Sequence, residues 1–208
     1  YNRRLLMLLA NNLQFKRQGL TIFENINVAA NPGKIILIKG NNGSGKTTLL
    51  KTLLNILEPA EGDVFWFGKN IKTDIFKFYI NTCYIMDKPT SNRDMSILEN
   101  IYFWKKFSKS TISDQEIIRI LNVLNLQNYA KQKIKFLSLG EIKKLELSRI
   151  IIEQKKLWIL DEPFSNLDSN SIDIISKTFI DHSKNGGSVV FASHYNPNIQ
   201  NEIISLDK

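Results

Sequence analysis

A glycine-rich run between an apolar segment and a leucine-patterned segment contains the residues best suited to chemistry. It reads G-N-N-G-S-G-K-T-T and begins at Gly40. Glycines let backbone N–H groups converge on one point, and the N-terminus of a following helix adds unpaired N–H groups and the positive end of its dipole. An ammonium at Lys46 suits the β- and γ-phosphates of a nucleotide, and a hydroxyl at Thr47 suits Mg²⁺. The run therefore predicts a site for a nucleoside triphosphate. The residues expected to bind it there are Gly40, Asn41, Asn42, Gly43, Ser44, Gly45, Lys46, Thr47 and Thr48.

The segments on either side of this turn would hold it in place. Residues 35–38 (I-I-L-I) are typical of a buried strand. Leucines at 49, 50, 53, 54 and 57 recur at helical spacing, so we expect a helix that runs to about Leu57. The alternative is a plain glycine turn followed by a lysine by chance. The strand–turn–helix context favours the nucleotide site, because the motif requires that context.

Two carboxylates end a second apolar run. Asp161 and Glu162 follow L-W-I-L, which is expected to be a buried strand. The carboxyl ends of parallel strands are where open α/β folds bind ligands. Asp161 would hold Mg²⁺ through a water molecule, and Glu162 would orient or deprotonate the attacking water. Alone, such a pair would more simply cap a helix before Pro163, but the phosphate turn favours the catalytic interpretation.

Further polar groups follow in order. The run S-N-L-D spans Ser165 to Asp168, and His194 closes the next apolar run. An imidazole at that strand end would be able to reach the terminal phosphate. A strand-end histidine is by itself more often a surface residue or one with its hydrogen bonds satisfied. Its position in the ordered set is what supports a catalytic role.

The run L-S-L-G-E, residues 137–141, opens a helical segment. Ser138 as N-cap and Glu141 three residues later form a capping box, which needs no further function. The same N–H groups and the Ser138 hydroxyl could also present an anion site to the γ-phosphate of a nucleotide on another subunit. Both interpretations can hold together.

Length and composition limit the architecture. The chain has 208 residues, is 43% hydrophobic and carries a net charge of +8. That length suits one domain with a small inserted lobe. No apolar run approaches the roughly 20 residues that span a bilayer, so no transmembrane segment is expected. The single cysteine, Cys83, is expected to be a buried small hydrophobe, and His182 a helix-surface residue. The charge is a weak hint of nucleic acid or an anionic membrane, because lysines alternate with acids.

The order of segments predicts a mixed fold. Strand-like segments occupy residues 5–30, helical segments dominate the middle, and strands alternating with helices return near the end. Such alternation implies a parallel sheet covered on both faces. We therefore expect one α/β domain over 1–208, with 1–90 and 141–208 as the catalytic core and about 91–140 as a helical subdomain.

The ordered set G-N-N-G-S-G-K-T-T, L-S-L-G-E, L-W-I-L-D-E-P-F-S-N-L-D and F-A-S-H resembles the ATP-binding cassette (ABC) family over essentially the whole chain. The resemblance implies a P-loop NTPase fold with an N-terminal antiparallel β part and an inserted helical subdomain. It also implies ATP and Mg²⁺ as ligands, and a head-to-tail homodimer that sandwiches two ATP molecules. The roles it implies are catalysis by Lys46, Glu162 and His194, a signature contact in trans by Ser138, Leu139, Gly140 and Glu141, and a D-loop with Ser165 and Asp168.

Several segments, among them G-D-V-F-W-F-G-K-N-I and H-S-K-N-G-G-S-V-V-F-A-S-H, are similar to the ATP-binding subunits of cytochrome c maturation complexes. This resemblance implies docking onto integral membrane subunits, at the inner membrane, from the mitochondrial matrix or bacterial cytoplasm. Hydrolysis would drive release of haem from its chaperone. Tyr102 or Trp104 would then line a groove for a helix of the membrane partner. The alternatives are a soluble cassette ATPase acting on nucleic acid, and a nucleotide-gated subunit with little hydrolysis; direct contact with nucleic acid is not expected.

The chain departs from the family pattern at three places. Leu139 and Glu141 replace the usual glycine and glutamine of the signature, and the charge of Glu141 should weaken closure around ATP. Lys88 stands where a metal-binding glutamine is usual; a protonated lysine has no lone pair, so either Asp87 would have to substitute or the contact is lost. Phe15 is the nearest aromatic to an adenine-stacking position, with a core role equally open.

Overall fold

The centre of the molecule is a five-stranded sheet with the order β6-β7-β8-β3-β9. This computed structural model describes residues 6–207. The strands are β3 (Ile35–Lys39), β6 (Thr82–Ile85), β7 (Leu157–Asp161), β8 (Ser188–Ala192) and β9 (Glu202–Ser205). All of their pairings are parallel. Every residue of β7 and β8 is buried, as expected for strands covered on both faces. The strand β9, at the sheet edge, was not predicted.

A second, antiparallel sheet has the order β2-β1-β4-β5. Its strands are β1 (Leu8–Arg17), β2 (Leu20–Ala30), β4 (Glu61–Trp66) and β5 (Lys69–Asn70). Gln18 and Gly19 make the turn between β1 and β2, both with positive φ, of 49° and 81°. The predicted α/β class with an antiparallel N-terminal part is confirmed. The expected strand start at Leu5 lies outside the described residues.

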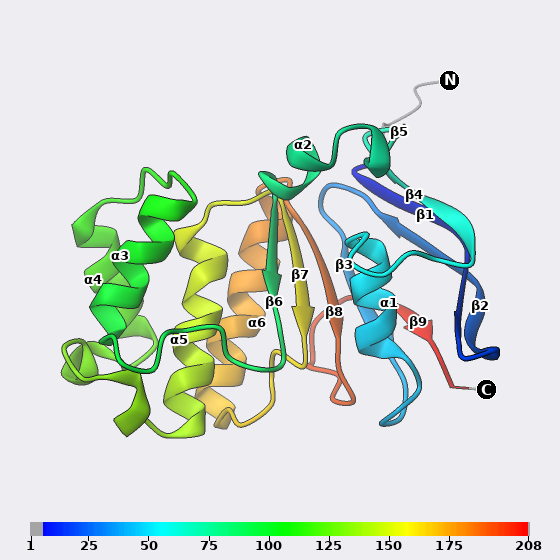
Figure 1. Ribbon diagram of the computed structural model, residues 1–208. Coiled ribbons are helices and arrows are strands. Elements are labelled where there is room, and N and C mark those ends of the chain that lie inside the picture. The colour runs from blue at the N-terminus through cyan, green and yellow to red at the C-terminus, as the bar shows by residue number, and fades with distance from the viewer. Residues whose placement is uncertain (1–5, 208) are drawn as a thin grey trace.

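Six α-helices lie in the described part of the chain. They are α1 (Lys46–Leu53), α2 (Ile75–Tyr79), α3 (Ile97–Phe107), α4 (Asp114–Val123), α5 (Leu139–Ile152) and α6 (Ser169–Lys184). Single 3-10 turns span Ile71–Thr73, Gln127–Tyr129 and Ile134–Phe136. In Figure 1, α3 and α4 form one end of the molecule beyond α5, and the antiparallel sheet forms the opposite end. The helix α1 is shorter than predicted, because Asn55 turns left-handed at φ 54° before Leu57.

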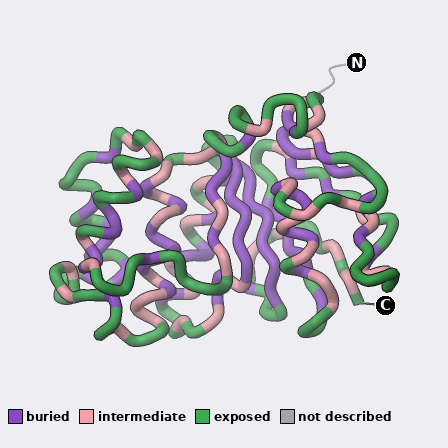
Figure 2. The backbone as a smooth tube through the Cα atoms, in the orientation of Figure 1, coloured by how far each residue is buried: buried purple, intermediate pink, exposed green. Residues whose placement is uncertain are grey.

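Alternate residues of the parallel sheet belong to two separate cores, as the twofold period of a strand requires. Ile36 and Ile38 pack with α1 and the antiparallel sheet. Ile35 and Leu37 belong to the other core, with residues of α3–α6. Figure 2 shows the central strands as a continuous buried band. The sheet therefore holds its strand ends between two packed layers.

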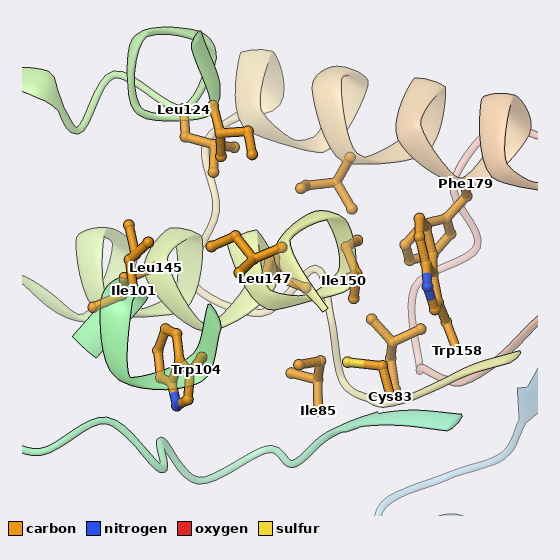
Figure 3. Close-up of a cluster of buried hydrophobic side chains, with 14 of the residues drawn as sticks. Cys83, Ile85, Ile101, Trp104, Leu124, Leu145, Leu147, Ile150, Trp158 and Phe179 are labelled. Atoms are coloured by element: carbon orange, nitrogen blue, oxygen red, sulfur yellow. The ribbon is translucent and has the colours of Figure 1, made fainter. Parts of the chain in front are cut away.

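Figure 3 shows part of the second core, with Trp158 of β7 beside Phe179 and Cys83. Cys83 is buried, as predicted. His182 is not a plain surface residue: its ring stacks on Trp158 at 3.5 Å between centroids. Trp104 is likewise in the core at 6% exposure, so it cannot line an open groove. The aromatic residues exposed on α3 are Tyr102, Phe103 and Phe107.

Candidate active site

The glycine loop between β3 and α1 has the backbone conformation that its residue types predict. Gly43 and Gly45 have φ values of 85° and 101°, a region that favours glycine. Gly45 is also closely packed, since an added Cβ would lie 2.7 Å from Cγ2 of Ile22. It stands at the N-cap of α1 and offers no side chain to the helix N–H groups. The N-terminus of α1 is therefore uncapped by side chains and faces the loop.

Lys46 lies inside the loop. Its side chain is 7% exposed, and Nζ donates to the carbonyl oxygens of Gly40 at 2.7 Å and Asn41 at 3.2 Å. The same Nζ is 3.5 Å from Oε1 of Glu162. The loop and the end of β7 therefore share one cation, although β8 and its turn separate β3 from β7 in the sheet.

Thr47 and Asp161 make the second link between loop and strand end. The Thr47 hydroxyl donates to Oδ2 of Asp161 at 2.7 Å. Burial is the main cause that raises the pKa of Asp161, and the Thr47 hydrogen bond only partly opposes it. Within the described part of the chain, Oδ1 of Asp161 and Oγ of Ser44 are buried without a hydrogen-bond partner. A buried carboxylate oxygen left free in this way suits a cation.

Glu162 connects Lys46 to His194. Its Oε2 lies 3.0 Å from Nδ1 of His194, whose side chain is 64% exposed. Glu162 adopts a positive φ of 45°, which is uncommon for a residue with a side chain. The extended conformation of β7 therefore ends before this residue. Its N–H donates to the Ala192 carbonyl at 2.9 Å, and its carbonyl accepts the Ser165 hydroxyl at 3.0 Å. The turn after β7 is thus held from both sides.

A hollow of about 330 Å³ lies above the loop. Its lining is made of Arg17, Ile22, Asn42, Gly43, Gly45, Lys46, Thr47, Thr48, Asp87 and Glu162. Phe15 is not part of it: the ring is buried in the core, 6.1 Å from that of Phe23, so the expected adenine contact is not supported. Arg17 and Ile22 line the hollow in place of the expected Phe15. Asp87 is among the residues that line the hollow, and Lys88 is not.

Lys143 is a residue of this site that the sequence did not reveal. It is 5% exposed on α5, and Nζ is 3.5 Å from the backbone oxygen of Asp161. Burial is the main cause that lowers its pKa, opposed by the nearby charges of Asp87, Asp161, Glu162 and Glu146. A lysine at a position where the helix faces inward is the only signal that could have identified it.

The signature turn caps α5, as predicted. Both the N–H and the hydroxyl of Ser138 donate to Oε2 of Glu141, at 2.7 and 2.8 Å, and the Glu141 N–H donates back to Oγ at 3.3 Å. Burial tends to raise the pKa of Glu141, but the Ser138 hydrogen bonds lower it overall. Leu139 is 68% exposed. An added Cβ at Gly140 would lie 2.9 Å from the carbonyl oxygen of Asn166, so the turn packs closely on the D-loop.

Asp168 ends the D-loop and caps α6, where its carboxylate accepts the Ser171 N–H at 2.8 Å. Residues 138–141, Ser165, Asp168 and His194 do not line the hollow of their own chain. The structure therefore unites the glycine loop, Asp161, Glu162 and His194, and leaves the signature turn apart from them.

Comparison with known proteins agrees with this arrangement. The family model described as "ABC transporter" matches residues 23–165. The cytochrome c biogenesis ATP-binding export protein CcmA of Reclinomonas americana is 34% identical over 193 residues, covering 91% of this chain and 86% of the relative. The protein of the same name from Dechloromonas aromatica (strain RCB) is 32% identical over 193 residues, covering 93% of this chain and 95% of the relative.

Solved structures agree on the fold. An ATP-binding protein of an ABC transporter from Pyrococcus furiosus has a TM-score of 0.84 at 23% identity, covering 96% of both chains. The ATP-binding subunit of another ABC transporter has a TM-score of 0.80 at 20% identity, covering 90% of this chain and 79% of that one. The chain therefore belongs to the ABC transporter family, and it is an ABC-type ATPase. Within the family it groups with the cytochrome c biogenesis ATP-binding export proteins, which confirms the resemblance seen in its motifs.

Proposed function

We propose that this chain binds and hydrolyses ATP as the ATPase subunit of a membrane complex for cytochrome c biogenesis, in which hydrolysis drives release of haem from its chaperone. The observation that carries the proposal is the match to two cytochrome c biogenesis ATP-binding export proteins over 91% and 93% of the chain. The uncapped N-terminus of α1 and the buried lysine beside it supply the chemistry that such a function needs.

ATP binds with its phosphates against the glycine loop. The N–H groups of the loop and of α1 face the phosphate oxygens, and Ser44, Thr47 and Thr48 add hydroxyls. Nζ of Lys46 exchanges the carbonyls of Gly40 and Asn41 for the β- and γ-phosphates. Asn42 and Gly43 line the outer wall of the hollow. Arg17 and Ile22, rather than Phe15, lie where the nucleoside would extend.

Hydrolysis needs a positioned water more than covalent chemistry. Glu162 accepts a hydrogen bond from the attacking water and takes its proton as the phosphorus–oxygen bond forms, and ADP leaves. His194, whose Nδ1 lies 3.0 Å from Oε2 of Glu162, would contact the γ-phosphate with its exposed ring. Lys46 neutralises charge that develops on the transferred group.

The residues at the strand end fit Mg²⁺. Oδ1 of Asp161 is buried without a partner in the described chain, and Thr47 and Asp87 add oxygen atoms of the kind that Mg²⁺ prefers. Bound there, Mg²⁺ would neutralise phosphate charge and orient the phosphates. Asp161 would act through a water molecule and Thr47 directly.

The signature turn acts on a second copy of the chain. The signature turn does not line the hollow of its own chain. A head-to-tail homodimer is therefore needed to bring Ser138, Leu139, Gly140 and Glu141 to a γ-phosphate. Ser165 and Asp168 would lie between the two nucleotides. A solved cassette of the same fold is described as a dimer bound to ADP and phosphate, with a TM-score of 0.76 at 21% identity.

The membrane partners are the integral subunits of the same complex. None of the helices between residues 6 and 207 is long and apolar enough to cross a bilayer. The similarity to the cytochrome c biogenesis export proteins supports a peripheral place on the inner membrane, at the matrix side in mitochondria or the cytoplasmic side in bacteria, without direct contact to nucleic acid. Tyr102, Phe103 and Phe107 on α3 offer exposed aromatic surface to a partner helix. We assign 91–140 as the helical signature subdomain of a single 1–208 domain, with 1–90 and 141–208 as its core.

The test is ATP turnover by the purified chain, alone and with its membrane partners, beside Glu162→Gln. We expect Glu162→Gln to reduce turnover by about 10²- to 10⁴-fold, the usual contribution of a general base, and to keep ATP binding. Unchanged turnover would refute the role of Glu162. Haem release that occurs with the active ATPase and is lost with the inactive one would establish that hydrolysis and release are coupled.

A second function is a nucleotide-gated subunit that closes on ATP with little hydrolysis. The observation in its favour is the Glu141 carboxylate at the signature turn, which places a negative charge where a phosphate would approach. Bound ATP without turnover, in every combination with the partners, would favour this function over the first.

A further inference from the structure

A buried carboxylate holds the segment after β6 against α5. Glu146 is 2% exposed. It accepts hydrogen bonds from the Thr90 N–H at 2.8 Å, the Thr90 hydroxyl at 2.9 Å and the Ser91 N–H at 2.7 Å. Such charge-assisted bonds are short and directional, and a carboxylate buried so deeply requires them. Residues 90 and 91 are therefore fixed relative to α5.

Two neighbouring side chains reinforce this attachment. NH1 of Arg149 donates to the Thr90 hydroxyl oxygen at 3.0 Å, and its guanidinium lies over the Trp104 ring of α3, 5.2 Å from the centroid. Asn100 of α3 accepts the Asn92 N–H at 2.8 Å. The segment is thus held by α3 as well as by α5.

The attachment is transmitted to the hollow over a short, stiff connection. Asp87, which lines the hollow, is only three residues before Thr90. Pro89 has a fixed φ and restricts Lys88 before it to extended conformations. The connection therefore has few alternatives once Thr90 is fixed. Lys143, one turn before Glu146, faces the same acidic groups from α5.

We propose that Glu146 is a positioning residue: through Thr90 and Ser91 it holds Asp87 at the edge of the hollow where the Mg²⁺ of a bound nucleotide would lie. The inference rests on the proposed function, since it concerns the metal of the bound ATP. It means that metal affinity depends on a residue of α5, the helix whose N-terminus is the signature turn.

The experiment measures Mn²⁺ binding by electron paramagnetic resonance, with a non-hydrolysable ATP analogue present. Nucleotide affinity in EDTA is measured in parallel with a fluorescent analogue. Glu146→Gln and Asp87→Asn are compared with Glu153→Gln. Glu153 is the control, because this largely buried residue at the C-cap of α5 pairs with Arg149 at 2.7 Å and makes no hydrogen bond of its own to the segment.

We expect Glu146→Gln and Asp87→Asn each to weaken Mn²⁺ binding about tenfold, as for a residue that orients a metal ligand. Nucleotide affinity in EDTA should stay as in the wild type, and Glu153→Gln should match the wild type in both measurements. Wild-type Mn²⁺ affinity in Glu146→Gln would overturn the inference. So would an equal loss in Glu153→Gln, which would indicate general loosening of α5, or a loss in Glu146→Gln without one in Asp87→Asn.

Thr90→Val removes one of the three hydrogen bonds and provides a second test if Glu146→Gln does not fold. A smaller loss of Mn²⁺ affinity supports the inference, and no loss overturns it. If the wild type binds no nucleotide at all, the proposed function itself has failed, an outcome that is distinct from wild-type nucleotide binding with an unaltered metal response in the variants.

Discussion

Two of the helices that begin at a motif, α1 and α5, have N-termini that are finished in opposite ways. At α1 the N-cap is Gly45, no side chain caps the helix, and the first turn has no acidic residue. At α5 the N-cap is Ser138, and Glu141 closes a full capping box. The same backbone geometry is open to an anion in one place and occupied by the chain's own carboxylate in the other.

The difference teaches that a helix terminus becomes a phosphate site only when its donors are left free. Glycines, a buried lysine and a close approach of Ile22 keep α1 open, at a cost in local stability. The capping box of α5 stabilises the helix and lowers the pKa of Glu141, which keeps its carboxylate charged. Four substitutions test this contrast.

The largest effect is expected at the open terminus. Lys46→Ala removes charge-assisted bonds to the phosphates, each worth about 1.5–3 kcal/mol, so ATP affinity should fall by roughly 100-fold. Titration with a fluorescent nucleotide measures it. Lys51→Ala, in the last turn of the same helix, should keep wild-type affinity. Equal losses in both variants would mean that general charge, rather than the loop, binds ATP.

At the closed terminus, removal of the charge should help. Glu141→Gln keeps an acceptor for Ser138 and eliminates the repulsion of a γ-phosphate, a gain of about 1 kcal/mol for charges about 4 Å apart at the dielectric constant of water. ATP-dependent dimerisation, followed by analytical ultracentrifugation in a Glu162→Gln background, should therefore tighten by about fivefold. An unchanged or weaker dimer would show that this turn does not meet the nucleotide.

Stability should respond to substitution at the capped terminus and hardly at the open one. Ser138→Ala removes an N-cap, which costs about 1 kcal/mol and lowers Tm by about 2–4 °C in a chain of this size. Ser44→Ala should leave Tm nearly unchanged, because the buried Ser44 hydroxyl has no hydrogen-bond partner in the described chain. Thermal melting without nucleotide checks both. A large loss at Ser44 would show that its hydroxyl is satisfied after all.

The smallest effect lies away from both termini, at His182. Burial is the main cause that lowers its pKa, so the unfolded chain takes up the proton first. The contribution of neutral His182 to the free energy of unfolding should then be fully present above about pH 6.5 and decline as the pH falls below it. His182→Phe, which keeps a ring on Trp158, should reduce that slope in denaturant titrations between pH 7 and pH 5. An identical slope would assign the pH dependence to other groups.

Site residues that belong to local sequence motifs were predicted better than residues whose surroundings depend on long-range packing. The glycine loop, Asp161, Glu162 and the capping box of Ser138 and Glu141 depend on near neighbours in sequence, and each was visible as a pattern. Lys143 was missed and His182 was misjudged because their surroundings come from distant elements; His182, for example, meets Trp158 across a helix–sheet contact. For Phe15, the core role that the sequence left open agrees with its burial beside Phe23 of the adjacent strand.

The fold followed the same division. Strands buried on both faces, such as β7 and β8, can be recognised in the sequence as apolar runs. The strand β9 is short, largely exposed and paired only with β3, so its sequence carries almost no signal. The lining of the hollow by Asp87 and not by Lys88 has no signal in the sequence.

The close approach of Gly140 to the Asn166 carbonyl has a consequence for how this chain can diverge. Any side chain at residue 140 would collide with rigid backbone rather than with a flexible group. A lineage that enlarges residue 140 must therefore first remodel the loop at residue 166. We expect substitutions at these two positions to appear together among descendants of this sequence, and seldom one without the other.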